Sequence, residues 1–195
     1  MKLGLDFYQR NGVSVACDLL GKLLVREIDG QQIIAKIVET EAYIGPEDKG
    51  CHAYQNKRTK RTEVMFGRAG CAYVYLIYGI HNCLNIVTAS EGKPEAVLIR
   101  AVEPIDGLDI VREYREIKSR KIEDLTNGPG KLCQALDIDR RLNGYDLVDG
   151  DKLYILDSDE RVEVVKGKRI NIDYAEEYKD KLWRFYIKGN SFVSR

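Results

Sequence analysis

Apolar residues gather in short segments that follow the spacing of β-strands. Residues 22–28 and 31–41 are two such segments, and the Asp29-Gly30 pair between them is the strongest short signal for a two-residue hairpin turn. Residues 72–78 and 82–89 repeat this arrangement around a glycine. The pattern therefore predicts two β-hairpins in the first half of the chain.

The remaining pattern adds strands and a few separate helices. Residues 95–102 are apolar at nearly every position, as in a strand buried on both faces. The other predicted elements are a helix at 12–20 that ends at Gly21, a helix at about 107–118 with Leu108, Val111, Tyr114 and Ile117 at helical spacing, a helix that begins in GPGKLCQAL (128–136), and strands at 152–156, 161–165 and 184–188. We expect an α+β fold, because strands come in hairpins and helices do not alternate with them. It would be a single domain, residues 1–195, with a mainly antiparallel curved β-sheet, segregated helices and a protruding β-hairpin.

The composition is that of an ordinary globular protein, with 195 residues, 44% hydrophobic and 32% charged. The 31 basic and 31 acidic residues balance, so any nucleic-acid signal must lie in their distribution. Five cysteines without CxxC spacing disfavour a disulfide framework and a zinc site. No signal-peptide core is present, and no stretch approaches the ~20 apolar residues of a membrane span. We expect a soluble, cytoplasmic protein.

The segment IVETEAY, residues 37–43, ends a predicted strand with two carboxylates. Because strand side chains alternate between faces, its odd-numbered residues, from Ile37 to Tyr43, are expected to project from one side. Glu39 and Glu41 then have two interpretations. They are surface charges at the end of a strand, or they are close carboxylates of which one acts as a general base.

The second hairpin and the strand after it carry polar residues in unusual places. Tyr73 and Tyr75 share one face, whereas Tyr78 belongs to the opposite face and lies at the turn, where a strand packing role does not explain it. Asn85 interrupts an apolar run and needs hydrogen-bond partners. Arg100 lies in the apolar strand AVLIRAV and needs an anion, for which the two glutamates are the candidates. The ion pair between Arg100 and a glutamate is either a structural pair or part of an active site.

Basic residues cluster in three segments. The run NKRTKRTEVMFG, residues 56–67, is a solvated loop or a track for DNA phosphates. GPGKL, residues 128–132, predicts a helix N-terminus suited to an anion, although it is not a P-loop. The residues concerned are Lys57, Arg58, Lys60 and Arg61 in the first segment, Lys131 in the second, and Lys166, Lys168 and Arg169 in a third, nonspecific patch.

Several long motifs together resemble the alkyladenine (3-methyladenine) DNA glycosylases. In order and spacing they are IVETEAYIGPEDKGCH, RTKRTEVMFG, YVYLIYGIHNCLN, AVLIRAVEP, GPGKLCQAL and FYIKG. The similarity runs from about Val13 to Ser194. It implies a base-excision repair enzyme that flips alkylated or deaminated purines, of the 3-methyladenine, 7-methylguanine, hypoxanthine and ethenoadenine type, out of duplex DNA. The N-glycosidic bond is then hydrolysed and an abasic site remains.

The resemblance also implies a role for individual residues. Glu41 would be the general base, Arg100 and the carbonyl of Ile170 would hold the attacking water, and Tyr78 would fill the space left by the extruded nucleotide. The base pocket would be lined by Tyr43, His52, Tyr75 and Asn85, with the backbone N–H of His52 reading the purine edge and Asn85 crowding out the exocyclic amine of guanine. Double-stranded DNA with damaged purines is the expected partner, without a cofactor or metal. The protein is expected to act as a monomer, at the nucleoid in a bacterium or in the nucleus of a eukaryote.

The chain departs from the family pattern at some positions, and two other functions stay open. Asn171 stands where many members have glycine, beside the carbonyl of Ile170, and GNSF replaces the commoner Gly-Ser-Pro-aromatic sequence. Such loop changes would suit a damage-binding protein without turnover. A metal-dependent hydrolase is the third alternative, with Glu39, Glu41, Glu47 and Asp48 as ligands and His52 nearby.

Overall fold

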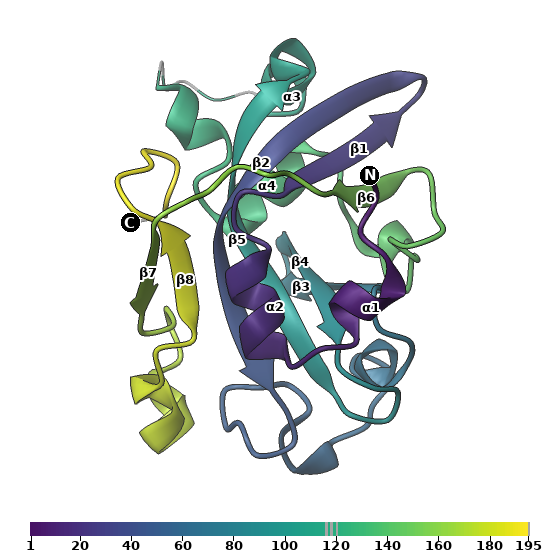
Figure 1. Cartoon of the computed structure of the whole chain (residues 1–195), viewed down its shortest axis with the longest axis vertical. Coiled ribbons are helices and arrows are strands. Elements are labelled where there is room, and N and C mark those ends of the chain that lie inside the picture. The colour runs from purple at the N-terminus through teal and green to yellow at the C-terminus, as the bar shows by residue number, and fades with distance from the viewer. Residues whose placement is uncertain (116, 118, 120, 195) are drawn as a thin grey trace.

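One antiparallel sheet of eight strands runs through the described part of this computed structural model, residues 1–115, 117, 119 and 121–194. The strands are β1 (Leu23–Ile28), β2 (Gln31–Ile44), β3 (Ala72–Ile77), β4 (His81–Thr88), β5 (Glu95–Asp106), β6 (Leu153–Leu156), β7 (Val164–Gly167) and β8 (Arg184–Ile187). The main order is β3-β4-β5-β2-β1-β6, and β8 pairs with both β2 and β7 (Figure 1). One side of the long β2 pairs with two strands in turn, with β1 along residues 31–36 and with β8 along residues 39–41.

The helices surround this sheet and are not interleaved with its strands. The α-helices of the described residues are α1 (Leu5–Tyr8), α2 (Gly12–Asp18), α3 (Leu108–Tyr114) and α4 (Pro129–Ala135), and the 3-10 helices are η1 (Tyr54–Asn56), η2 (Glu63–Phe66), η3 (Ile122–Leu125), η4 (Arg140–Leu142) and η5 (Asp173–Asp180). α2 packs against β2 and β5, and α4 packs against β4 and β5. The predicted α+β class with a mainly antiparallel sheet is confirmed. No helix of the described residues is long and apolar enough to cross a membrane.

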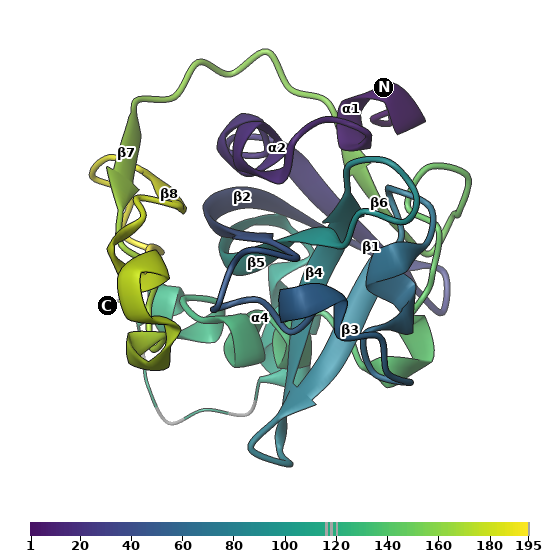
Figure 2. The same ribbon diagram turned by 90° about the horizontal axis from the view of Figure 1, so that it is seen from below.

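Both predicted hairpins are present. Asp29 and Gly30 have φ angles of 48° and 80°, the left-handed pair required by a tight turn between β1 and β2. Tyr78 and Gly79, with φ angles of 53° and 73°, turn the chain between β3 and β4. This second hairpin extends beyond the rest of the molecule at the lower edge of Figure 2, so the protruding hairpin is confirmed.

A β-bulge on β2 lies immediately before the two carboxylates. Ile37 pairs with Val102 and Glu39 pairs with Ala101, so Val38 is an extra residue without a partner position on β5. A bulge bends its strand and changes which face the following side chains reach. It therefore contributes to the curvature of the sheet at this point.

A second bulge follows directly on β5. Glu39 pairs with Ala101 and Thr40 pairs with Ile99, so Arg100 is the extra residue on this strand. The bulges cancel in register, since each strand has gained one residue. The register is therefore the same from Ala35 to Ile37 as from Thr40 to Ile44. Arg100 is directed to the same side as the carboxylates, to which it donates hydrogen bonds.

The predicted common face of residues 37–43 is wrong for its first member. Ile37 belongs to the main hydrophobic core together with Ala42, which an uninterrupted strand would place on the opposite face. Glu39, Glu41 and Tyr43 do share a face, as their mutual contacts described below require. The bulge at residue 38 is the physical reason, because an extra residue inverts the alternation of side chains.

Other differences concern the ends of elements. The predicted burial of 95–102 on both faces is confirmed, since every residue of this range is buried. α2 ends at Asp18 and α3 at Tyr114, both earlier than predicted, and positions 116 and 118 of the second predicted helix lie outside the described residues. The strand predicted at 161–165 is displaced to β7, where Val164 pairs with Ile187 of β8.

Candidate functional site

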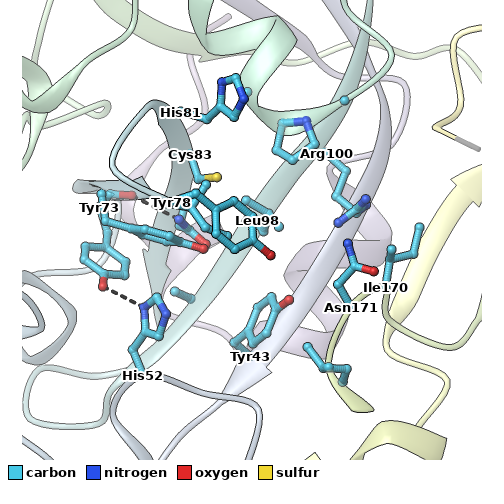
Figure 3. A pocket seen from close by; sticks show the side chains of 18 of the residues that line it. Tyr43, His52, Tyr73, Tyr78, His81, Cys83, Leu98, Arg100, Ile170 and Asn171 are labelled. Atoms are coloured by element: carbon cyan, nitrogen blue, oxygen red, sulfur yellow. Dashed lines mark hydrogen bonds between the residues drawn. The ribbon is translucent and has the colours of Figure 1, made fainter. Parts of the chain in front are cut away.

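A cavity of about 520 Å³ opens between the β3–β4 hairpin, β5, the start of α4 and the segment around residue 170. This volume lies within the range of roughly 300–1,000 Å³ that is typical of small-molecule sites. Figure 3 shows side chains from these separate segments turned toward one space. Eight of the residues for which the sequence predicts a role in the site line this cavity, namely Tyr43, His52, Tyr75, Tyr78, Asn85, Arg100, Lys131 and Ile170.

Glu41 lies behind the cavity wall and is fully buried. Its Oε1 accepts a hydrogen bond from the backbone N–H of Ile170 at 2.7 Å. Its Oε2 accepts from the Tyr43 hydroxyl at 2.8 Å and from Nη1 of Arg100 at 3.3 Å. A carboxylate offers about four lone-pair positions, so three donors leave one of them unused. The site thus holds a buried carboxylate directly behind three residues of the cavity wall.

Glu39 is equally buried but more completely enclosed. Its carboxylate accepts from Nε of Arg184 at 2.6 Å and from Nε of Arg100 at 3.2 Å, and also from the backbone N–H and hydroxyl of Ser194 at 2.7 and 2.9 Å. The prediction that Arg100 pairs with a nearby glutamate is confirmed for both carboxylates, including Glu41. Two arginines therefore balance the two buried negative charges.

The charge of Arg100 is secured by the same pairs. Burial alone lowers the pKa of Arg100, but the charges of Glu41 and Glu39 outweigh burial and raise it above its usual value. A buried guanidinium with two carboxylate partners remains ionised. Without it Glu41 would be an uncompensated buried charge, whereas Glu39 would keep its ion pair with Arg184. The three groups therefore act as one electrostatic unit.

Aromatic rings form a further part of the cavity wall. The His52 and Tyr75 rings meet edge to face with centroids 4.6 Å apart, and the Tyr73 and Tyr75 rings are tilted at 5.3 Å. Tyr43 completes the wall, and burial followed by the charge of Glu41 raises its pKa well above the usual value. Tyr43 is therefore a neutral hydroxyl that donates toward Glu41.

His52 has a defined protonation state. Burial, and then the charge of Arg61, lower the pKa of His52 to about 4, so the ring is neutral at pH 7. A guanidinium can only donate hydrogen bonds, so Nε2 accepts from Arg61 Nη2 at 3.4 Å. The remaining proton then lies on Nδ1, which donates to the Tyr73 hydroxyl at 2.9 Å. These neighbours together fix the tautomer and the orientation of the ring.

This burial makes stability depend on pH in a predictable direction. The pKa of His52 is lower in the folded chain than in the unfolded chain, so the unfolded chain binds more protons between pH 6.5 and about 4. The contribution of neutral His52 to the stability of the fold is therefore fully present above pH 6.5, the ordinary pKa of histidine, and it is lost as the pH falls from 6.5 to about 4. We expect melting temperatures to show a loss in this window that is smaller in His52→Asn. An equal loss of melting temperature in His52→Asn would show that His52 is not the group responsible.

The side-chain amide of Asn85 has a hydrogen-bond partner, as the sequence requires of a polar group in an apolar run. It is buried, and Nδ2 donates to the carbonyl of Tyr73 on the neighbouring strand at 3.2 Å. This bond holds the carboxamide against the cavity, where its bulk limits the space beside the rings. Its predicted discrimination against guanine stays a prediction.

Tyr78 lies at the tip of the protruding hairpin and is 79% exposed. Ile80, two residues further on, is 71% exposed. Neither side chain packs in the core, which excludes a role for Tyr78 as a buried strand residue. Large apolar side chains at an exposed tip next to a cavity are suited to contact another molecule.

The basic residues differ in how they are held. Arg58 forms two hydrogen bonds to Glu63, at 2.6 and 2.9 Å, whereas Arg61 lies over the Tyr75 ring at 4.7 Å from its centroid. Lys60 is exposed, and Lys131 at the cavity rim donates to Asn127 Oδ1 at 2.6 Å.

We expect the double variant Arg58→Gln, Arg61→Gln to weaken DNA binding by the same factor for damaged and undamaged duplexes. Each lost phosphate contact should reduce the slope of log K against log salt by about one. Binding isotherms across a salt series measure this slope. Arg10→Gln is the matched control, because Arg10 is also ion-paired, with Asp18, and lies near α1 and α2, away from the hairpin in Figure 2. An unchanged slope would assign residues 57–61 to a solvated loop.

Arg169 contradicts the third predicted basic patch. It is buried and forms an ion pair with Asp48 through hydrogen bonds of 2.5 and 2.8 Å. Its guanidinium also lies over the rings of Tyr43 and Trp183, at 4.8 and 5.1 Å. An arginine next to a buried carboxylate is retained inside the protein by charge pairing, which the local sequence does not reveal. Arg169 therefore fastens the segment of Ile170 to the loop of Asp48.

The four carboxylates that the sequence offers as metal ligands do not point to one common position. Asp48 is paired with Arg169, and Glu47 is exposed, while Glu39 and Glu41 are bound by Arg100. Among residues 1–115, 117, 119 and 121–194, no group of three or more His, Cys, Asp or Glu side chains is arranged to hold a metal ion.

The sequence predicts no role in the site for Tyr73, Arg184 or Ser194. Tyr73 was recognisable from its i, i+2 spacing with Tyr75, whereas Ser194 and Arg184 carry no local signal. Asn171 has a φ of 59° and lines the cavity, as expected for a residue that replaces glycine in left-handed geometry. In Figure 3 its carboxamide points to the space beside Arg100.

Comparison with known proteins agrees with this geometry. Residues 6–191 match the family model of methylpurine-DNA glycosylase. A relative from Natranaerobius thermophilus is 60% identical over 196 residues, all of this chain and 99% of the relative. Relatives from Desulfitobacterium hafniense and Clostridium acetobutylicum are 52% and 53% identical, over 99% and 100% of this chain and 98% of each relative. All three carry an inferred assignment as 3-methyladenine DNA glycosylases. Over nearly its whole length, this chain is therefore a member of the methylpurine-DNA glycosylase family.

Proposed function

We propose that this protein flips alkylated or deaminated purine nucleotides out of duplex DNA and hydrolyses their N-glycosidic bonds with water activated by Glu41. The observation that carries the proposal is the buried Glu41–Arg100 pair directly behind a cavity walled by aromatic rings. Such a cavity accepts a flat base, and the charged unit lies at one side of it. Flipping is required because the glycosidic bond of a stacked nucleotide is out of reach.

The aromatic wall accounts for base binding. A purine that lies between Tyr43 and the His52–Tyr75 rings gains roughly 1–3 kcal/mol from stacking. A neutral His52 adds no positive charge to this wall. Purines alkylated at N3 or N7 are cationic, so a neutral electron-rich wall favours them over the ordinary bases. Asn85 would then exclude guanine by its contact with the exocyclic amine.

The charged unit accounts for bond cleavage. Departure of the base leaves positive charge on the sugar, and a nearby carboxylate stabilises this charge while it orients and deprotonates water. Glu41 retains one free lone-pair position for that water, and the N–H groups of Arg100 are available to hold it. The carbonyl of Ile170 is proposed as the third water ligand, since its N–H fixes Glu41 from the same peptide segment.

The reaction is proposed to be monofunctional. Lys131, the lysine among the residues lining the cavity, donates to Asn127 and is held at the rim. Water is then the nucleophile, and the DNA strand is not nicked. The proposed partner is double-stranded DNA, bound by a monomer through the hairpin and the basic residues 57–61.

Single-turnover excision from duplexes that each contain one lesion tests this function. The panel comprises 3-methyladenine, 7-methylguanine, hypoxanthine and ethenoadenine, each with and without EDTA. We expect release of at least one base, an abasic product that breaks only after alkali, and unchanged activity in EDTA. Lesion-specific binding without base release would establish a damage-binding protein, and loss of activity in EDTA would establish metal-dependent hydrolysis.

A further inference from the structure

The segment that follows β8 returns across the two bulges. Phe192 packs with Val38, the extra residue of β2, and with Ala101 in a separate small hydrophobic cluster. Asn190 anchors this turn, because its Oδ1 accepts from the N–H of Phe192 at 2.9 Å and its Nδ2 donates to Glu103 at 2.8 Å. The bulge thus creates the apolar surface that fixes the position of this segment, drawn in yellow in Figure 1.

This anchoring places Ser194 against the buried charged unit. Its N–H donates to Oε2 of Glu39 at 2.7 Å, and its hydroxyl donates to Oε1 at 2.9 Å. The same hydroxyl accepts from Nη2 of Arg100 at 3.3 Å, and the carbonyl accepts from Nη2 of Arg184 at 3.1 Å. The N–H, hydroxyl and carbonyl of this one residue are all engaged, and Ser194 is only 7% exposed.

Each nitrogen of the Arg100 guanidinium consequently has a different partner. Nε donates to Glu39, Nη1 to Glu41 and Nη2 to Ser194, at 3.2 to 3.3 Å. A guanidinium has five N–H groups, so two of them, one on each Nη, remain for the cavity that Arg100 lines. The direction of these two N–H groups depends on the three bonds behind them, of which the Ser194 hydroxyl supplies the one at Nη2.

We propose that Ser194 is a positioning residue for Arg100, and that it orients the guanidinium for the reaction without touching the substrate. Arg184 assists by holding both Glu39 and the carbonyl of Ser194. This role rests on the proposed function of Arg100 and Glu41 in hydrolysis. The segment after β8 is accordingly a component of the reaction site, although it lies on the side of Arg100 away from the cavity.

Ser194→Ala, Ser194→Thr and Ser194→Gln provide the test, with Ser191→Ala as the matched control. Ser191 is exposed and lies in the same segment three residues earlier. In Ser194→Ala we expect the single-turnover excision rate to fall about tenfold to a hundredfold, as for a misplaced catalytic group. The dissociation constant for the lesion duplex should equal that of the wild type, since Arg100 keeps its charge. Ser194→Thr retains the hydroxyl and should restore the rate, whereas the larger Ser194→Gln should not.

A purely structural role predicts a different result. Ser194→Ala would then lose binding and rate in proportion to a lower melting temperature, and Ser194→Thr would not restore the rate; either finding overturns the proposal. A wild-type rate in Ser194→Ala overturns it as well. If Ser194→Ala does not fold, Arg184→Gln is decisive, with a slower rate at unchanged binding supporting the proposal and a wild-type rate refuting it. Absence of excision by the wild-type protein would instead reject the proposed function and this inference with it.

Discussion

Glu41→Gln is expected to abolish base excision while binding of a lesion duplex remains close to that of the wild type. The amide is nearly isosteric with the carboxylate and can still accept hydrogen bonds at its oxygen from Tyr43 and Arg100. It cannot deprotonate water or stabilise positive charge on the sugar. The expected loss in single-turnover rate is roughly 10²–10⁴-fold, the range for removal of a general base. Single-turnover kinetics with an abasic-site readout measure the rate, and fluorescence anisotropy measures binding.

Glu39→Gln is the matched comparison, because it neutralises the neighbouring carboxylate on the same face of β2. Glu39 accepts hydrogen bonds from Arg184, Arg100 and Ser194 and is further enclosed than Glu41. Its replacement should lower the melting temperature, since two arginines lose a buried counter-charge, and should reduce the rate less than Glu41→Gln does. Equal losses of rate in two normally folded variants would show that the general base has been assigned to the wrong carboxylate.

Tyr78→Ser is expected to weaken binding to a lesion duplex without changing the melting temperature. Tyr78 is 79% exposed at the hairpin tip, so its truncation does not produce the loss of about 3–5 kcal/mol that follows removal of a buried aromatic ring. If the ring occupies the space left by the flipped nucleotide, its removal destabilises the extruded state. The chemical step at saturating enzyme should be affected far less than binding.

The opposite strand provides the diagnostic control for this variant. When the lesion lies in a mismatch or opposite a gap, less stacking must be broken, so the deficit of Tyr78→Ser should become smaller. Ile105→Ser is a suitable protein control, since Ile105 is also an exposed apolar residue but lies near the end of β5 outside the cavity. A deficit of the same size on every duplex, or an early melting transition, would contradict the wedge role.

Local patterns were sufficient for much of the fold. The Asp29-Gly30 turn and the apolar runs beside it specify β1 and β2, because turn geometry and strand alternation are properties of neighbouring residues. The bulge at Val38 has no such signal. Residues 37–42 are buried without exception, so the polar–apolar alternation that would reveal a change of phase is missing. Arg100 offered the one indirect clue, as a charge within an apolar strand.

The site was predictable to the extent that its partners are close in sequence or carry improbable chemistry. The pairing of Arg100 with the carboxylates follows from the cost of burying a guanidinium without an anion. The other partners of Glu39 could not be found in this way, because Arg184 and Ser194 are 145 and 155 residues distant. Arg169 was misassigned for a related reason: basic residues in a row look alike until the buried carboxylate that selects one of them is located.

The bulges of β2 and β5 make the effect of a deletion depend on whether the lost residue is paired. Val38 has no partner position on β5, so its deletion would leave the pairs on either side in place and Ile37 and Glu39 on opposite faces, but would remove the apolar side chain that packs with Phe192. Deletion of Arg100 would likewise keep the pairing but remove the guanidinium. Deletion of a paired residue such as Thr40 would instead invert the alternation after it and bring Glu41 and Tyr43 to the core face, so this region should tolerate the loss of an unpaired residue better than the loss of a paired one.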